Sequence, residues 1–234
     1  MTSQQKNTMV KSSFWKRVRI ALFAMAIVGV LVPGCLLLSI RSQPEFYRES
    51  LKMDPVTIQR ESESVTKKIA DLQSKAAQPD TKWATRISDT EINALIASTS
   101  TDELKKSVGN LIKDPRIAIH ADRVELACQF EGGPLSGVLH LSASVQMQKT
   151  NLLAVRVRDV HLGAVPFSRD QAFKLAYDAM KGAGTKVSQG SEGGDPVLLI
   201  QLDPKTQTGL PILFDSIVLE DGNFHFSGKT GKGK

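Results

Sequence analysis

The four histidines of the chain are the side chains best suited to chemistry, because imidazole can bind a metal ion or transfer a proton near neutral pH. They are His120, His140, His161 and His225, and all lie in or beside segments with strand-like alternation. None has a second metal ligand nearby in a known spacing, and the motifs H-E-x-x-H and C-x-x-C do not occur. His120 and His140 could share a metal site if their strands are neighbours. Solvent-facing positions on a sheet are the simpler interpretation.

Other catalytic patterns are also missing from the sequence. A serine nucleophile would need a G-x-S-x-G turn, which does not occur. The five glycines from Gly182 to Gly194 lack the flanking elements of a phosphate-binding loop. They predict a flexible connection or, alternatively, a mobile lid. We therefore expect no catalytic residue, no metal and no cofactor, and a protein that is not an enzyme. Histidines and carboxylates gathered in one pocket would argue against this expectation.

Charge is distributed unevenly along the 234 residues. The net charge is +6, but six basic residues and no acidic residue precede position 43, which leaves 24 basic and 24 acidic residues for the rest. A nucleic-acid-binding domain would carry basic charge on its folded part, so no nucleic-acid partner is expected. The two cysteines, Cys35 and Cys128, predict no disulfide framework. Cys128 is expected to be a small apolar core residue.

An uncharged run of 21 residues, Ile20–Ile40, is long enough to cross a hydrocarbon layer of about 30 Å as a helix. Five Lys and Arg residues precede this run, so segment 1–19 is expected in the cytoplasm and the chain after residue 42 outside it. The prediction is a single-pass cell-membrane protein with an extracytoplasmic domain. A cleaved signal peptide and a lipoprotein signal ending at Cys35 are alternatives. The length of the apolar run, which continues past Cys35, favours the uncleaved anchor.

Segment 41–82 is predicted to contain a juxtamembrane stretch and a polar helix of roughly Val56–Ala77. One narrow apolar stripe follows the helix, formed by Val65, Ile69, Leu72 and Ala76. The stripe could pack on its own domain or pair with a partner helix, and the first interpretation is the simpler one.

The extracytoplasmic domain is predicted to span 83–228 and to begin with a short strand or extended link at Trp83–Ile87. Ser88 is followed three residues later by Glu91, which forms a capping box and predicts a helix start. A second short helix is expected at Asp102–Ile112. It ends before the Asp114-Pro115 pair, because the residue before proline disfavours the α region.

From Pro115 the apolar period changes to two, which predicts four strands joined by short, antiparallel links. One face of this meander is apolar and the opposite face is polar. The apolar positions are Ile117 and Ile119, then Val124, Leu126, Cys128 and Phe130, then Leu139, Leu141, Ala143, Val145 and Met147, then Leu153, Val155 and Val157.

A second capping box at Ser168 predicts a helix at Asp170–Met180 that covers part of the apolar face. Three more strands are expected, the last two joined by an Asp221-Gly222 hairpin turn, at Val197–Leu202, Ile212–Leu219 and Asn223–Phe226. The tail 229–234 is predicted to be disordered. The expected fold class is α+β, with an N-terminal transmembrane helix followed by a long-stranded, curled antiparallel sheet packed on one or more helices.

A curled sheet with one apolar face can close on its covering helix or leave an apolar groove beside it. The closed form is a packed core, whereas the open form would bind a lipid or another apolar ligand. The candidate lining residues are Leu126, Phe130, Leu141, Val145, Val155, Phe173 and Phe226. For each of them taken singly, a place in an ordinary core is the simpler interpretation.

Four segments of the chain carry a family resemblance. They are the N-terminal anchor, Ile87-Ser88 with Glu91-Ile92-Asn93-Ala94-Leu95, Asp114-Pro115-Arg116 before the meander, and Leu162-Gly163-Ala164-Val165-Pro166 before the next helix. Over about residues 14–226 the chain resembles the YpmS-like family of bacterial proteins. The resemblance implies one membrane helix and an extracytoplasmic α+β domain, and it assigns no catalytic residue. More remotely, the expected sheet is similar to tubular lipid-binding domains, which would imply an elongated apolar cavity.

Together these features predict a membrane-anchored extracytoplasmic domain that binds a lipid or other apolar envelope component without catalysis. Its expected partners are the lipid bilayer and an apolar ligand. The alternative is a scaffold or assembly module that contacts an envelope protein through its polar sheet face or the Val56–Ala77 helix.

Overall fold

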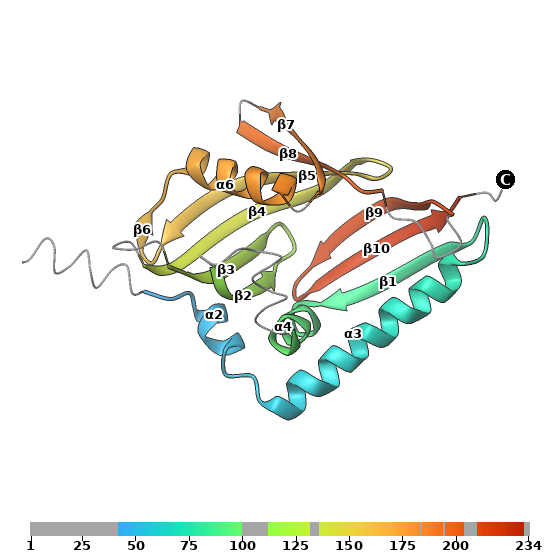
Figure 1. The fold of residues 1–234 in the computed structure, drawn as a ribbon, viewed down its shortest axis with the longest axis horizontal. Coiled ribbons are helices and arrows are strands. Elements are labelled where there is room, and N and C mark those ends of the chain that lie inside the picture. The colour runs from blue at the N-terminus through green and yellow to red at the C-terminus, as the bar shows by residue number, and fades with distance from the viewer. Residues whose placement is uncertain are drawn as a thin grey trace, which may run out of the picture.

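The computed structural model describes residues 42–99, 112–131, 136–182, 184–193, 195–203 and 210–231. It is mostly antiparallel sheet with a few helices, which agrees with the predicted α+β class and is consistent with a curled sheet. Figure 1 shows a long sheet beside a three-stranded sheet. The elements are α2 (Glu45–Ser50), α3 (Pro55–Ala76), β1 (Lys82–Ser88), α4 (Asp89–Ser98), β2 (Ile112–Ile119), β3 (Val124–Phe130), β4 (Gly137–Lys149), β5 (Leu152–Leu162), β6 (Val165–Pro166), α6 (Arg169–Gly182), β7 (Lys186–Glu192), β8 (Asp195–Gln201), β9 (Ile212–Glu220) and β10 (Asn223–Thr230).

The long sheet has the order β2-β3-β4-β5-β8-β7, with β6 beside β5. Its first four strands are the predicted meander. Leu126 lies opposite Leu141, and His140 lies opposite His161. Because cross-strand partners point to the same side of a sheet, this register gives the long sheet one mainly apolar and one mainly polar face.

Helix α6 covers the apolar face over β5 and β8. Val157 and Val160 of β5, Leu198 of β8, and Ala172 and Phe173 of α6 form one buried cluster. Full burial of each large apolar side chain contributes about 1.5–3 kcal/mol. The helix therefore packs as the sequence pattern predicts.

The start of α6 follows only part of the expected capping pattern. The Gln171 N–H donates to Ser168 Oγ at 3.4 Å, which is one half of the expected capping box. The reciprocal bond is not found among the described contacts.

The small sheet, in the order β1-β10-β9, joins the start of the domain to its C-terminal hairpin. Its aromatic rings form a chain of contacts. Phe214 makes edge-to-face contacts with two rings, Trp83 at 5.0 Å between ring centroids and Phe226 at 6.5 Å. Phe226 in turn stacks on Phe224, with 5.4 Å between centroids. Such pairs add about 0.5–1.5 kcal/mol each beyond the burial of their area. These rings form an aromatic cluster separate from the cluster under α6.

Glu91 joins α4 to α3. The predicted capping box is present, since the Glu91 N–H donates to Ser88 Oγ and the Ser88 N–H donates to Glu91 Oε2. The same carboxylate accepts hydrogen bonds from Ser64 Oγ at 2.6 Å and Lys68 Nζ at 2.7 Å. Burial raises the pKa of Glu91, but the bonds from Lys68, Ser64 and Ser88 outweigh it and hold the pKa below its ordinary value. A buried carboxylate thus ties two helices together.

One asparagine side chain joins helix α4 to the long sheet, and another joins the two sheets. From α4, Asn93 Nδ2 donates to the Ile117 carbonyl and Asn93 Oδ1 accepts from the Ile117 N–H, both at 2.8 Å. From the β4–β5 turn, Asn151 Nδ2 donates to the Ile212 carbonyl, and Asn151 Oδ1 accepts from the Phe214 N–H at 2.6 Å. Each side-chain amide thus pairs with backbone N–H and carbonyl groups at the edge of a strand, in the way that the backbone of a neighbouring strand would.

Several expectations need correction. The glycine-rich stretch predicted as a flexible connection contains strand β7, which pairs with β8 along its length. Strand β10 runs to Thr230, so residues 229 and 230 belong to a strand and not to a disordered tail. Ile112, predicted as the end of a helix, begins β2. The stretch predicted to lie next to the membrane contains the short helix α2, and the described strands form two sheets where one was expected.

Other predictions lie outside the described residues. The membrane span Ile20–Ile40 and most of the helix predicted at Asp102–Ile112 fall there. Within the described part of the chain, no helix is both long enough and apolar enough to cross a membrane. Cys128 is a free, buried thiol, as expected, and burial raises its pKa to about 11.

Replacing Asn93 with Ala should destabilise the protein by about 1–3 kcal/mol, because the Ile117 N–H and carbonyl would lose their partners. The free energy of unfolding from urea denaturation measures this loss. The exposed substitution Gln73→Ala on α3 is the control and should change stability little. Equal stability of the two variants would show that the hydrogen bonds between the Asn93 side chain and the Ile117 backbone do not stabilise the fold.

Replacing Gly228 with Ala should also be destabilising. The strand register shifts at Gly228, and an added Cβ would overlap the Leu213 carbonyl and lie 2.6 Å from Trp83 Cζ2. A backbone carbonyl within a sheet cannot move aside cheaply, so we expect a loss of at least about 1–3 kcal/mol. Gly182→Ala is the matched control, because nothing lies within 4 Å of its added Cβ. Thermal unfolding of both variants would test the difference.

Candidate functional site: the polar face of the long sheet

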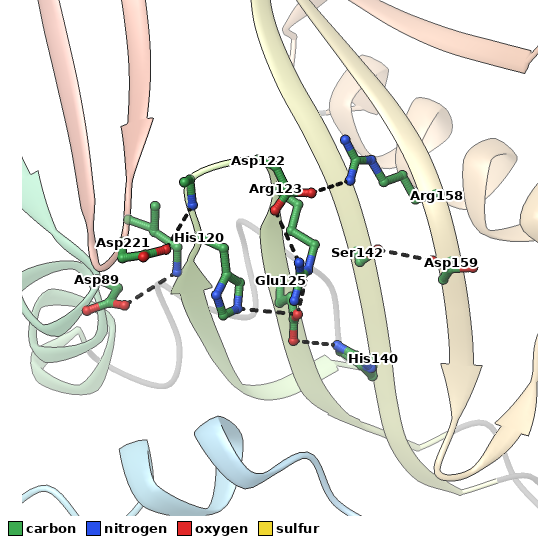
Figure 2. Close-up of polar contacts among 12 residues, drawn as sticks. Asp89, His120, Asp122, Arg123, Glu125, His140, Ser142, Arg158, Asp159 and Asp221 are labelled. Atoms are coloured by element: carbon green, nitrogen blue, oxygen red, sulfur yellow. Dashed lines mark hydrogen bonds and ion pairs between the residues drawn. The ribbon is translucent and has the colours of Figure 1, made fainter.

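A cluster of charged and imidazole side chains lies on the polar face of the long sheet. Figure 2 shows its centre, the Glu125 carboxylate on β3. Arg123 Nε donates to Glu125 Oε1 at 2.9 Å, His120 Nε2 lies 3.3 Å from the same oxygen, and His140 Nε2 lies 3.1 Å from Oε2. We call these four residues the Glu125 cluster.

The carboxylate of Glu125 is only 14% exposed. Burial raises its pKa. The hydrogen bonds from Arg123 and His140 and the charge of His120 lower it by more, so the pKa lies below the ordinary value. The group therefore stays ionised at neutral pH. It can orient the two imidazoles that it contacts.

His140 extends the cluster along the sheet. Its ring stacks on that of His161 on β5, with 6.2 Å between centroids, and also contacts Phe46 of α2 at 5.8 Å. The strands that carry His120 and His140 are not neighbours, because β3 lies between them. Glu125 on that middle strand bridges the two histidines instead. His225 is in the other sheet, 2.9 Å from Glu220.

The arrangement gives no support for a metal centre. Across the described part of the chain, no three His, Cys, Asp or Glu side chains converge in a way that could hold a metal ion. Glu125 presents a different oxygen to each histidine and also accepts from Arg123. Its coordination capacity is therefore used within the protein.

A groove of about 470 Å³ begins beside the Glu125 cluster. Its floor is the polar face of β4 and β5, and one wall is the edge of β9. The lining residues are Ala121, Asp122, Ser144, Val145, Gln146, Arg156, Arg158, Glu192, Ile217, Val218 and Leu219. We call it the β9 groove.

Two ion pairs line the β9 groove. Arg158 Nη1 donates to Asp122 Oδ2 at 2.7 Å, and Figure 2 shows this pair beside the Glu125 cluster. Arg156 Nη2 lies 2.9 Å from Glu192 Oε2, and Gln146 Nε2 donates to the same carboxylate. The groove is thus polar and has no excess of charged side chains of either sign.

The seven residues predicted to line an apolar site are divided among several places. Phe173 of α6 belongs to the buried cluster beneath that helix, and Leu141 and Val155 pack against this cluster. Leu126 is 39% exposed and Phe130 is partly buried. Val145 lines the β9 groove, and Phe226 lies in the other sheet, where it lines a separate groove of about 370 Å³. The structure therefore does not gather them around one cavity.

Sequence reasoning identified the polar positions of β4 and β5 but missed their partners. Asp122 lies in a turn and Glu192 at the end of β7, and neither has a local signal linking it to an arginine. Arg156 and Arg158 alternate with the apolar positions Val155 and Val157, as expected for the polar face of the predicted meander. Their joint placement depends on the tertiary fold.

Fold and site together define a two-sheet α+β protein with a polar groove between one sheet face and one sheet edge. Comparisons with protein-family models, with curated proteins and with solved structures each find no match. The resemblance to the YpmS-like family therefore stays a prediction.

The Glu125 cluster predicts an acid-dependent stability. Because the pKa of Glu125 is lower in the folded protein, its carboxylate stabilises the fold above the unfolded pKa of about 4.3, and this contribution is lost as pH falls through the folded pKa. Glu125→Gln should therefore be less stable than wild type at about pH 7 but differ less from it at about pH 3. Thermal unfolding across this range measures the gap.

The control for this experiment is Glu45→Gln, since the Glu45 side chain is 85% exposed. It should follow the wild-type protein at every pH. A gap for Glu125→Gln that stays constant with pH would contradict the proposed role of the ionised carboxylate.

Proposed function

We propose that this protein is a membrane-anchored, extracytoplasmic scaffold module that contacts another envelope protein through the polar face of its long sheet, without catalysis. The β9 groove is the observation that carries the proposal, because it is a concave, polar surface bounded by side chains from both sheets. Polar side chains and wet, partly charged contacts are usual in protein interfaces. The predicted anchor would keep this surface at high local concentration beside its partner.

The cluster of histidines and a carboxylate does not by itself favour an enzyme. His120 and His140 both point their Nε2 atoms at Glu125, so their contacts are directed within the cluster. A catalytic group must instead reach a substrate atom. We therefore keep the non-catalytic function as the proposal.

Binding of a lipid or other apolar envelope component is a second candidate. It is favoured by one observation, the 39% exposure of Leu126 on the apolar face, opposite the partly buried Leu141. The core beneath α6 is closed by its own side chains, so an apolar ligand would have to bind at this uncovered margin.

Photo-crosslinking in cells distinguishes these functions. A benzophenone amino acid at Gln146, on the groove floor, should trap one defined envelope protein. The same probe at Leu126 tests the apolar margin, and at Gln73 it tests the exposed side of α3. A protein adduct from Gln146 supports the proposal.

The other outcomes have equally definite meanings. A lipid adduct at Leu126 with none at Gln146 would replace the proposal by the second candidate. A protein adduct at Gln73 alone would move the contact surface to α3 and overturn the role of the polar face. No adduct at any position would also count against it.

A further inference from the structure

The small sheet has one covered face and one open face. Helices α3 and α4 both contact β1. Within this strand Trp83 is buried, whereas Lys82, Ala84 and Arg86 are exposed. Successive side chains of a strand point to opposite sides of the sheet, so the three exposed residues share one face. We call this side the outer face of the small sheet.

A row of small side chains forms a trough across the outer face. Ala84 of β1 lies opposite Ser227 of β10, and Ser227 lies opposite Ser216 of β9. All three line the groove of about 370 Å³ that Phe226 also lines. The row crosses three strands, which lie about 4.8 Å apart, so the trough is about 10 Å long. We call it the serine trough.

Basic side chains flank the serine trough on both sides. On one side Lys82 lies directly opposite Lys229, and on the other side Arg86 lies directly opposite His225. Each pair is two residues, or about 7 Å, from the row of small side chains. Like charges directly opposite each other in a sheet are destabilising, so the lysine pair is unfavourable for the protein alone. An anion bound between the two sides would offset this repulsion.

Three of these basic side chains have no carboxylate partner. Within the described part of the chain, no ion pair involves Lys82, Arg86 or Lys229. Arg86 Nε instead donates to the neutral side chain of Asn223 at 2.8 Å. In the β9 groove, by contrast, both arginines already pair with carboxylates.

The acidic residues of the small sheet are engaged elsewhere. The three strands contain two of them, Asp215 and Glu220. Asp215 Oδ1 accepts a hydrogen bond from Thr150 Oγ1, in the β4–β5 turn, at 3.3 Å. Glu220 Oε2 lies 2.9 Å from His225 Nε2. Neither carboxylate pairs with the three cations, so the charge beside the serine trough is complementary to an anion.

The shape of the site favours a linear anionic polymer over a membrane surface. A flat bilayer would contact the side chains that project from the sheet and would leave the trough unfilled. A single extended chain fits within it, with Ala84 and Val218 against its carbon atoms. The two unesterified oxygens of a phosphodiester diverge from such a chain, so each phosphate can reach the basic side chains on both sides. A carboxylate holds both oxygens at one end of a planar group.

Nucleic acids are phosphodiester polymers too, but their single strands usually stack bases on free aromatic rings. The ring of Phe226, which lines the serine trough, already contacts the rings of Phe214 and Phe224. The site therefore favours a polymer without bases.

We propose that the outer face of the small sheet binds a linear polymer of phosphodiester-linked polyols, which lies across the strands in the serine trough. Its phosphates lie between the lysine pair on one side and Arg86 on the other. Binding weakens with salt, because each phosphate contact releases counterions. This surface lies in the other sheet from the groove floor of the proposed function and does not depend on that function.

The test uses the full chain in micelles of a neutral detergent and an end-labelled synthetic poly(glycerol phosphate) of about ten units. Fluorescence anisotropy should show saturable binding that weakens as the salt concentration rises. Polyglutamate with the same number of charges should bind at least about tenfold more weakly, because its carboxylates do not reach both sides of the trough.

The double variant Lys82→Gln/Lys229→Gln should bind the polymer at least about tenfold more weakly, with a smaller dependence on salt. Lys67→Gln/Lys174→Gln makes the same change of charge at exposed lysines of α3 and α6 and should bind as wild type. Ala84→Leu fills the trough without a change of charge and should also weaken binding at least about tenfold. Matching circular dichroism spectra separate lost binding from lost folding.

Four results would overturn the proposal: no saturable binding of poly(glycerol phosphate), equal binding of polyglutamate, equal binding by the two double variants, or wild-type binding by Ala84→Leu. Displacement of the polymer by phosphatidylglycerol added to the micelles would overturn it in favour of lipid headgroups. Tighter binding of an oligothymidylate of equal phosphate number would overturn it in favour of nucleic acid. The crosslink at Gln146 tests the proposed function separately, since these variants leave the groove floor unchanged.

Discussion

Strand β9 and the turn that follows it are attached to the long sheet at two places, and between them no strand among the described residues pairs with the outer edge of β9. The candidate site follows from this constraint. At one end Asn151 occupies the backbone of Phe214. At the other, the Gly222 N–H donates to the Ile119 carbonyl, and the Ala121 N–H donates to Asp221 Oδ1. Because buried backbone groups must be paired, these bonds satisfy strand ends and also set the distance between the sheets. The β9 groove is the space that remains between the two attachments.

The Glu125 cluster has a related structural effect on the polar face. Glu125 holds His120 and Arg123, which flank the β2–β3 turn, and also His140 on β4. Asp122, in the same turn, forms an ion pair with Arg158 and so connects the turn to β5. A network of charge-assisted bonds over β3, β4 and β5 thus fixes one end of the groove. Such positioning is what a rigid binding surface requires.

Local signals in the sequence predicted the elements that depend on local chemistry. The capping box of Ser88 and Glu91, the alternation of the meander and the Asp221-Gly222 turn, where Gly222 has a φ of 73°, all involve residues close in sequence. Strand β7 could not be predicted, because a glycine-rich segment becomes a strand only by pairing with β8. Likewise, β1 finds its partner β10 near the far end of the chain, which divides one expected sheet into two. The groove depends on both of these pairings, so no local pattern predicts it.

The link between the proposed anchor and the groove is helix α2. Tyr47 is buried against Ala127 and Val138 of the long sheet, and Phe46 contacts the ring of His140. Burial raises the pKa of Tyr47 to about 12, so its phenol stays neutral in this contact. The segment that follows the predicted span is therefore packed on the sheet face that carries the Glu125 cluster. If the span lies in a bilayer, this packing limits how the domain rotates relative to the membrane, and it holds the β9 groove in a restricted orientation toward a partner at the same surface.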